Sequence, residues 1–311
     1  MALIFIDGSS GTTGLKIYDR LKGRSDIDLL ILPEAERKDP VKIKEALHAA
    51  DISFLCLPDE AAKEAVALAE GSDTVIIDTS TAHRTDPAFV YGFPEITGAE
   101  KIMASKRVAN PGCHASGFIA LIYPLVKEGL ISKDAKLSCF SLTGYSGGGK
   151  KMIAQYEAED KDKLLEGPRQ YALTQEHKHL KEMKRVTGLS DFPVFSPIVA
   201  DFYSGMEVMV PLFASDVKGS MNDIKEAYKG FYTGPLVHYE EEADEEGFLS
   251  AAAFAGRDDM QITVTGNVER MMLTARFDNL GKGASGAAIQ NMNIILGTEE
   301  TLGLVTGGEL K

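Results

Sequence analysis

The first third of the chain alternates short apolar runs with helix-like segments. The pattern predicts strands at residues 3–6, 29–32, 52–57 and 74–77, with helices at 15–21, 41–49 and 60–70 between them. The apolar runs do not alternate with polar residues, which is typical of strands covered by helices on both faces. We therefore predict a doubly wound α/β domain with a parallel sheet at the N-terminus.

The pattern changes after residue 113. Here it predicts a helix at 115–126, a strand at 136–142, a glycine-rich loop at 145–149, a polar and partly helical stretch at 160–189, and a helix at 283–296. Apolar and polar residues alternate within 194–213 and 261–277, which is typical of an antiparallel sheet with one wet face. The predicted fold is a Rossmann-type domain at 1–113, completed by a C-terminal helical segment at 283–311, and an α+β domain with a mixed antiparallel sheet at 114–282.

Composition narrows the class of protein. The 311 residues carry a formal net charge of -13, which argues against a nucleic-acid partner. No apolar window reaches the ~18 residues of a membrane span, and the N-terminal apolar run is too short for a signal peptide. Cys56, Cys113 and Cys139 lie far apart without C-x-x-C spacing, so neither a disulfide scaffold nor a zinc site is expected. These features favour a cytoplasmic protein.

A glycine-rich turn joins the first predicted strand to the first helix. Gly8, Gly11 and Gly14 permit a tight turn and close approach of a pyrophosphate to the helix N-terminus, and hydroxyl donors flank them at Ser9, Ser10, Thr12 and Thr13. Spacing and position predict a dinucleotide cofactor. Arg37 and Lys38, after the second strand, are suited to a 2′-phosphate and favour NADP over NAD; an exposed charged loop explains the same residues.

Cys113 is the predicted nucleophile. The turn Asn110-Pro111-Gly112 precedes it and a helix begins at or just after it, so the helix dipole favours the thiolate. The alternative, a buried cysteine acting as a small hydrophobe, fits Cys56 and Cys139 better because both lie within apolar strands.

A thiolate needs a proton-transfer partner, and the chain offers six histidines. His48 and His238 are interpreted as surface residues, and His83 as a neighbour of the cofactor. His114 follows the cysteine directly and is interpreted as a poor base, because adjacent helical positions diverge. His177 and His179 remain as candidates, and the pair lacks the further ligand that a metal site requires.

A second glycine-rich segment, residues 143–150, follows a predicted strand. Its backbone N–H groups are suited to a leaving phosphate or an oxyanion, and Lys150 adds positive charge. The candidate phosphate-binding residues are Ser146, Gly147, Gly148 and Lys150. A flexible surface loop is the alternative interpretation.

Together these segments resemble the shorter class of the N-acetyl-γ-glutamyl-phosphate reductase family, within the aspartate-semialdehyde dehydrogenase-like superfamily. The resemblance covers nearly the whole chain: IDGSSGTTGL, DTSTAHRTD, YGFPE, ANPGCHASG, GYSGGGK, HKHLKEM and DNLGKGASGAAIQNMN. The cysteine segment and the C-terminal segment are the specific ones.

The resemblance implies NADPH-dependent reduction of an acyl phosphate through a cysteine thioester, as in arginine biosynthesis. It places the nucleophile on Cys113 and the acid/base on His177 or His179, and it adds Ser80 and Asn279 to the cofactor site and Asn110 to the substrate site. It also implies a catalytic and dimerisation role for residues 114–282 and a homodimer or homotetramer. Two positions depart from the family: Lys181 replaces a proline of the longer class, and Ile198 replaces a histidine that many relatives carry.

Three other functions remain open from the sequence. The first is an aspartate-semialdehyde dehydrogenase, which performs the same chemistry on a shorter substrate. The second is a cysteine hydrolase, which has no use for the first glycine turn. The third is a non-catalytic protein that senses a dinucleotide, in which Cys113 has no role.

Overall fold

The computed structural model describes residues 1–307, which form two compact units. The N-terminal unit contains residues 1–112 and 284–304, and the second unit contains 113–283 and 305–307. The two units are described separately below. Among the described residues, no helix has the length and apolar character needed to cross a bilayer.

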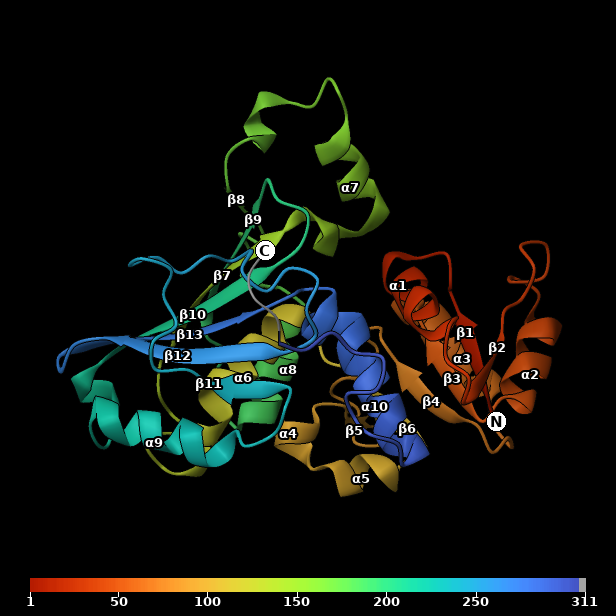
Figure 1. Ribbon diagram of the computed structural model, residues 1–311, viewed down its shortest axis with the longest axis horizontal. Coiled ribbons are helices and arrows are strands. Elements are labelled where there is room, and N and C mark those ends of the chain that lie inside the picture. The colour runs from red at the N-terminus through yellow and green to blue at the C-terminus, as the bar shows by residue number, and fades with distance from the viewer. Residues whose placement is uncertain (308–311) are drawn as a thin grey trace. The chain divides into compact units, whose positions relative to one another are not determined.

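The N-terminal unit is built on a six-stranded parallel sheet with the order β2-β1-β3-β4-β6-β5 (Figure 1). Its strands are β1 (Ala2–Asp7), β2 (Ile27–Leu30), β3 (Ile52–Leu55), β4 (Val75–Asp78), β5 (Val90–Tyr91) and β6 (Arg107–Ala109). Its helices are α1 (Thr12–Leu21), α2 (Pro40–Ala49), α3 (Asp59–Leu68), α4 (Pro94–Thr97), α5 (Ala99–Met103) and α10 (Gly286–Leu296). The order, with β1 between β2 and β3, confirms the predicted doubly wound sheet.

Both faces of this sheet are buried. Ile4 and Ile6 pack in a cluster with Ile17 of α1 and Ile289 of α10, whereas Phe5 packs in a second cluster with Leu47 of α2. Consecutive side chains of β1 therefore enter opposite apolar layers, which explains its uninterrupted apolar run. In Figure 1, the blue helix α10 accordingly lies with the N-terminal unit.

The structure confirms the predicted end of the helix at residue 296 but does not continue it through the predicted helical segment 283–311. α10 ends at Leu296, where Gly297 adopts a φ of +66° and caps the helix. The following residues up to 307 contain turns and irregular backbone, and part of the predicted range, 308–311, lies outside the described residues.

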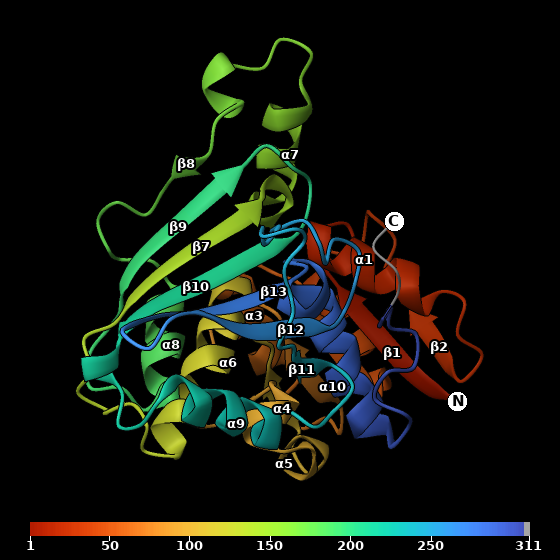
Figure 2. The same cartoon turned by 60° about the vertical axis from the view of Figure 1, so that its left-hand side comes forward.

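The second unit is built on a mixed seven-stranded sheet with the order β11-β12-β13-β10-β7-β9-β8 (Figure 2). Its strands are β7 (Ser138–Gly144), β8 (Arg169–Gln170), β9 (Val194–Ala200), β10 (Met206–Phe213), β11 (Val237–Tyr239), β12 (Met260–Gly266) and β13 (Arg270–Phe277). Its helices are α6 (Cys113–Lys127), α7 (Gly149–Glu157), α8 (His179–Thr187) and α9 (Met221–Phe231), with 3₁₀ turns η1 (Tyr145–Gly148), η2 (Lys163–Leu165) and η3 (Ala214–Asp216) and a π-helical turn η4 (Gly281–Ser285).

Two local predictions for this unit need correction. β9 runs parallel to β7, so the alternating segment 194–213 is not antiparallel throughout. The glycine-rich segment at 145–149 is not an open loop, because η1 continues directly into α7. Gly149 joins the turn η1 to the helix α7 with a φ of +72°, a conformation that glycine adopts without steric cost.

Helices cover one face of the second sheet. Figure 2 shows α6, α8 and α9 on one side of the strands. Val208 of β10 and Phe277 of β13 meet α6 at Gly117, where an added Cβ would lie 2.5 Å from the nearest Val208 carbon. Glycine at this position lets the helix approach the sheet closely, and α6 is buried along almost its whole length. The helix that begins with Cys113 is thus held rigidly.

Candidate active site

Cys113 is the first residue of α6, a 15-residue helix, and its side chain is partly exposed. The unpaired N–H groups of a helix N-terminus stabilise a thiolate at this position. Burial raises the pKa of Cys56 to about 12 and raises that of Cys139 even further. Those two thiols therefore stay protonated at neutral pH, and Cys113 is the cysteine suited to nucleophilic chemistry.

A cluster of aromatic rings lies in the same unit. The His114 ring centroid is 5.7 Å from that of His177 and 5.6 Å from that of His179, and the rings of His177 and His179 are 4.6 Å apart. Phe195 of β9 packs edge-on against His114 and His177. Three histidines from two segments of the chain thus meet in one cluster.

The sequence-based interpretation of His114 was incomplete. His114 is only 3% exposed and makes two short hydrogen-bond contacts, from Nδ1 to Ser141 Oγ at 2.7 Å and from Nε2 to the Tyr171 hydroxyl at 2.6 Å. Burial, and secondarily the charge of His177, lower its pKa to about 3. His114 is therefore neutral at physiological pH.

His177 and His179 occupy different environments. His179 is 6% exposed at the start of α8, and its Nε2 lies 3.9 Å from Glu182 Oε1. His177 is partly exposed, and its Nδ1 accepts a hydrogen bond of 3.2 Å from the His179 backbone N–H. When Nδ1 accepts, the proton of neutral His177 resides on Nε2. His177 can then offer an N–H to a substrate oxygen.

The side chain of Asn279 binds the second glycine-rich segment through a hydrogen bond to Ser146. Its amide donates a 3.0 Å hydrogen bond to Ser146 Oγ and accepts one of 2.9 Å from the Gly205 N–H. Ser146 is buried, whereas Gly147, Gly148 and Lys150 are exposed. The Asn279 side chain, assigned to the cofactor from the sequence, thus has a structural task within the second unit.

In the N-terminal unit, the first glycine turn is shaped for close approach. Gly8 has a φ of +80°, and an added Cβ there would lie 2.3 Å from the Cys56 carbonyl oxygen. A Cβ on Gly14 would lie 2.4 Å from the Gly8 carbonyl oxygen. Gly11 caps α1, whose first turn carries no acidic side chain. The first turn of α1 therefore adds no carboxylate that would compete with a pyrophosphate for the helix N–H groups.

The remaining candidates of this unit are distributed as follows. Ser10 is exposed, Thr12 and Thr13 are partly exposed at the start of α1, and Lys38 is exposed after β2. Arg37 is partly exposed and pairs with Glu34 at 3.1 Å between Nη2 and Oε1. Arg37 and Lys38, the two cations of the predicted 2′-phosphate site, are thus at least partly exposed to solvent within the N-terminal unit.

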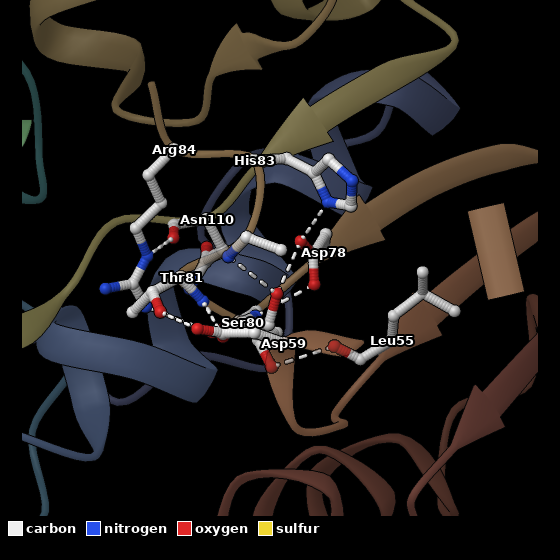
Figure 3. A network of polar contacts seen from close by, with 10 residues as sticks. Leu55, Asp59, Asp78, Ser80, Thr81, His83, Arg84 and Asn110 are labelled. Carbon is white, nitrogen blue, oxygen red and sulfur yellow. Dashed lines mark hydrogen bonds and ion pairs between the residues drawn. The ribbon is translucent and has the colours of Figure 1, made fainter. Parts of the chain in front are cut away.

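The loop after β4 contains a buried polar network (Figure 3). Asp78 Oδ2 lies 2.7 Å from both Ser80 Oγ and His83 Nδ1, and Asp78 itself is fully buried. Arg84 Nε donates to the Asn110 carbonyl oxygen at 2.9 Å, and the Asn110 amide donates to the Ala284 carbonyl oxygen, also at 2.9 Å. The side chains of Ser80 and Asn110 therefore hold loops of the N-terminal unit together.

Asp7 ends β1 directly before the glycine turn and carries an unusual carboxyl group. It is 4% exposed, and among the described residues its Oδ2 has no hydrogen-bond partner. Burial raises the pKa of Asp7 from 3.8 to about 6, against the opposing effect of a hydrogen bond from the Gly8 backbone. The ionised carboxylate is thus poorly stabilised in the folded protein.

We expect Asp7→Asn to stabilise the protein at alkaline pH. The raised pKa means that the folded chain binds this proton more tightly than the unfolded chain, so stability is lost as pH rises from 3.8 to about 6. Asparagine avoids that cost, and the free energy of unfolding at pH 8 should rise by about 1–3 kcal/mol. Urea unfolding at pH 8 and pH 3 measures this, with the gain absent at pH 3. A variant that is no more stable than the parent at pH 8 contradicts the assignment.

Sequence reasoning missed Ser141 and Tyr171. Both contact His114 but lie 27 and 57 residues away in the chain, so no local spacing connects them. It also passed over Lys282, which is 2% exposed although it carries an ammonium group. The sequence offered one chemical signal for the partners of His114: a buried histidine needs polar groups to bind its ring nitrogens.

Comparisons with known proteins identify the family and support the fold. A family model described as "Semialdehyde dehydrogenase, NAD binding domain" matches residues 14–104, and "Semialdehyde dehydrogenase, dimerisation domain" matches residues 113–279. Among solved structures, aspartate semialdehyde dehydrogenase II of Vibrio cholerae has a TM-score of 0.72 at 14% identity and covers 95% of this chain and 98% of its own, which supports the fold.

Curated relatives are closer in sequence. An N-acetyl-gamma-glutamyl-phosphate reductase from Brucella suis is 46% identical, over 94% of this chain and 98% of the relative. N-acetyl-gamma-glutamyl-phosphate reductase 2 from Nostoc sp. is 43% identical, over 97% of this chain and 98% of the relative. Identity at this level over the whole length places the chain with these proteins, and it belongs to the N-acetyl-gamma-glutamyl-phosphate reductase family of oxidoreductases.

Proposed function

We propose that this chain reduces N-acetyl-γ-glutamyl phosphate to N-acetyl-glutamate semialdehyde and phosphate, using NADPH and a thioester on Cys113. The observation that carries the proposal is a partly exposed cysteine at the N-terminus of α6, in the same unit as a partly exposed histidine that presents an N–H. The relatives bear the name of this reaction. Aspartyl phosphate, the substrate of the alternative reductase, is shorter and has no acetyl group.

The Cys113 sulfur forms a bond to the acyl carbon as the bond from that carbon to the phosphate oxygen breaks. His177 acts here in its imidazolium form: it gives its Nε2 proton to the departing phosphate and returns to the neutral imidazole. Gly147, Gly148 and Lys150 are the groups we assign to that phosphate. When bound, NADPH would supply a hydride to the thioester carbonyl, which leaves the anion of a thiohemiacetal on Cys113. That adduct collapses to the aldehyde and regenerates the thiolate. Such a thiolate persists in a reducing compartment, which favours the cytoplasm.

The cofactor assignment to NADP rests on the end of β2. An NAD enzyme generally carries an acidic residue there for the ribose hydroxyls, whereas Ile31, Leu32 and Pro33 follow β2 in this chain. Glu34 and Glu36 come next in the same turn, and Arg37 and Lys38 after them supply positive charge for a 2′-phosphate. Gly8, Ser10, Gly11, Thr12, Thr13 and Gly14 are the residues we assign to the pyrophosphate, and Ser80 lies in the loop after β4 on the same sheet.

The reverse reaction tests substrate and cofactor together. With phosphate present, we expect rapid reduction of NADP by N-acetyl-glutamate semialdehyde and at least about tenfold lower kcat/KM with aspartate semialdehyde or with NAD. Absorbance of the reduced nicotinamide follows all four combinations. A preference for aspartate semialdehyde would assign the alternative reductase. Failure to bind either cofactor, together with hydrolysis of an ester, would assign a cysteine hydrolase.

We also propose that two copies of the chain meet through the uncovered face of the second sheet. Phe140, Val194 and Phe213 are 42%, 59% and 64% exposed, and the strand register places them on the face opposite α6. Exposed apolar surface on this scale marks an interface. Sedimentation should show a species of at least twice 33.6 kDa that Phe140→Lys dissociates. A parent protein that stays monomeric at micromolar concentration contradicts this proposal.

A further inference from the structure

One arginine of the second unit carries its charge without an acidic partner. Arg169 lies on β8, the strand at the edge of the sheet beside β9 (Figure 2), and it is partly exposed. Its Nε and Nη2 donate hydrogen bonds of 3.3 Å and 3.0 Å to the Tyr156 hydroxyl, and its Cζ lies 5.3 Å from the centroid of that ring. Within residues 1–307, no carboxylate forms an ion pair with its guanidinium.

Tyr156 holds this guanidinium in one orientation. The Tyr156 side chain is only 3% exposed, and its ring stacks on that of Tyr145 with 4.8 Å between centroids. Glu157, the next residue of α7, accepts a hydrogen bond from the Tyr145 hydroxyl at 3.4 Å. Of the five N–H donors of Arg169, two bind Tyr156 and three remain. A guanidinium fixed in this way is preorganised to bind an anion such as a carboxylate.

Strand register places Arg169 level with the second glycine-rich segment. Thr143, the first residue of that segment, pairs with Val199 of β9, and Val199 pairs with Arg169. Neighbouring strands lie about 4.8 Å apart, so this row of three residues spans about 10 Å of backbone. Arg169 thus lies on one row with the start of the segment to which we assign the phosphate.

The next row on the same face of the sheet holds the histidine cluster. Ser141 of β7 pairs with Pro197 of β9, and the Tyr171 N–H donates to the Pro197 carbonyl oxygen at 3.1 Å. His114 spans this row, with contacts of 2.7 Å to Ser141 Oγ and 2.6 Å to the Tyr171 hydroxyl. The ring of His177, the assigned acid/base, lies 5.9 Å from that of Tyr171. Each of these strand residues is two positions from its counterpart in the first row, and side chains two positions apart share a face.

The dimensions of the substrate fit this arrangement. N-acetyl-γ-glutamyl phosphate carries its phosphate on the reacting acyl carbon and an α-carboxylate four carbon–carbon bonds away, about 5 Å in an extended chain. His114, which contacts Tyr171, directly follows Cys113 in the chain. Arg169 lies two residues before Tyr171, about 6.7 Å along the strand. We propose that Arg169 binds the α-carboxylate of the substrate and that Tyr156 is the positioning residue that orients its guanidinium. The proposal rests on the proposed function, which supplies the identity of the substrate.

Paired substrates test the contact through its charge. In the reverse reaction with NADP and phosphate, the enzyme is assayed with N-acetyl-glutamate semialdehyde and with 4-acetamidobutanal, the same aldehyde without its carboxylate. Arg169→Gln should raise the KM for N-acetyl-glutamate semialdehyde by roughly ten- to hundredfold, because a charge-assisted contact is lost. Its kcat/KM for 4-acetamidobutanal should stay within about threefold of the parent value. Arg169→Lys keeps the charge without the planar fork and should give an intermediate KM for the carboxylated aldehyde.

A second variant tests the positioning role. Tyr156→Phe keeps the ring and removes the hydroxyl that accepts from the guanidinium. It should raise the KM for N-acetyl-glutamate semialdehyde by roughly three- to tenfold with kcat nearly unchanged. Equal KM values in Tyr156→Phe and the parent would overturn that role. Arg270→Gln is the matched control: Arg270 is an exposed arginine of the same unit, 3.5 Å from Glu269, and its loss should leave both KM values unchanged.

The outcomes distinguish the carboxylate from the phosphate. A higher KM for phosphate in Arg169→Gln, with an unchanged KM for the aldehyde, would overturn the proposal and assign Arg169 to the phosphate. Equal losses with both aldehydes would also overturn it, because a damaged fold affects both substrates alike. A parent enzyme that reduces NADP with neither aldehyde would end the proposed function. An active parent whose kinetics Arg169→Gln leaves unchanged would end the assignment of Arg169 alone.

Discussion

Cys113→Ser should lower the rate of aldehyde formation by at least about a thousandfold. A serine hydroxyl at the start of α6 stays protonated at neutral pH, whereas the helix N-terminus favours the thiolate form of a cysteine at the same place. The covalent step is therefore lost, while the N-terminal unit that carries the glycine turn is unchanged. NADPH titration by fluorescence should give the parent affinity, and steady-state assays with the acyl phosphate should give the loss of kcat.

Cys139→Ser and Cys56→Ser are the matched controls. Both thiols are held protonated by burial, so neither can replace the nucleophile. We expect each control to keep more than about a tenth of the parent kcat, with any loss traceable to stability. A Cys113→Ser enzyme that retained substantial reductase activity would remove the thioester from the mechanism.

His177→Gln should lower kcat by about 10²- to 10⁴-fold with little change in KM. His177 is the partly exposed member of the histidine pair, and the His179 N–H on its Nδ1 directs its own proton to Nε2. Glutamine can still donate a hydrogen bond but cannot transfer the proton. The pH profile of kcat should therefore lose one ionisation in the variant.

His179→Gln is the comparison that separates the two histidines. His179 is buried at the start of α8, with its Nε2 3.9 Å from Glu182 Oε1. We therefore expect its side chain to stabilise the start of the helix and not to contact the substrate. Its backbone N–H, which orients His177, survives the substitution. We expect a smaller loss of kcat than in His177→Gln. The reverse order of effects would transfer the acid/base role to His179.

The sequence predicted the N-terminal fold well because its signals are local. Uninterrupted apolar runs such as β1, whose Ile4, Phe5 and Ile6 enter two opposite layers, require a sheet covered on both sides. The second unit was harder to predict. The direction of β9 relative to β7 depends on a long connection through α7 and α8, and alternation along a strand carries no information about direction.

The residues of the candidate site likewise fall into two groups: those with a local sequence signal and those that only the tertiary fold brings together. Cys113 was identifiable because the turn before it and the helix after it are both local signals. The partners of His114 were not, because Ser141 and Tyr171 reach it only when three elements of the fold pack together. The second glycine-rich segment was recognised, yet its continuation into α7 was not, since three consecutive glycines favour a loop by propensity.

Mass spectrometry of the protein mixed with N-acetyl-γ-glutamyl phosphate and no cofactor tests the central assignment most directly. Without a hydride donor the acylated enzyme should accumulate, and the peptide containing Cys113 should gain the mass of one N-acetyl-glutamyl group that hydroxylamine removes. An unmodified Cys113 peptide after full release of phosphate, or an acyl group on Cys56 or Cys139, would contradict the account.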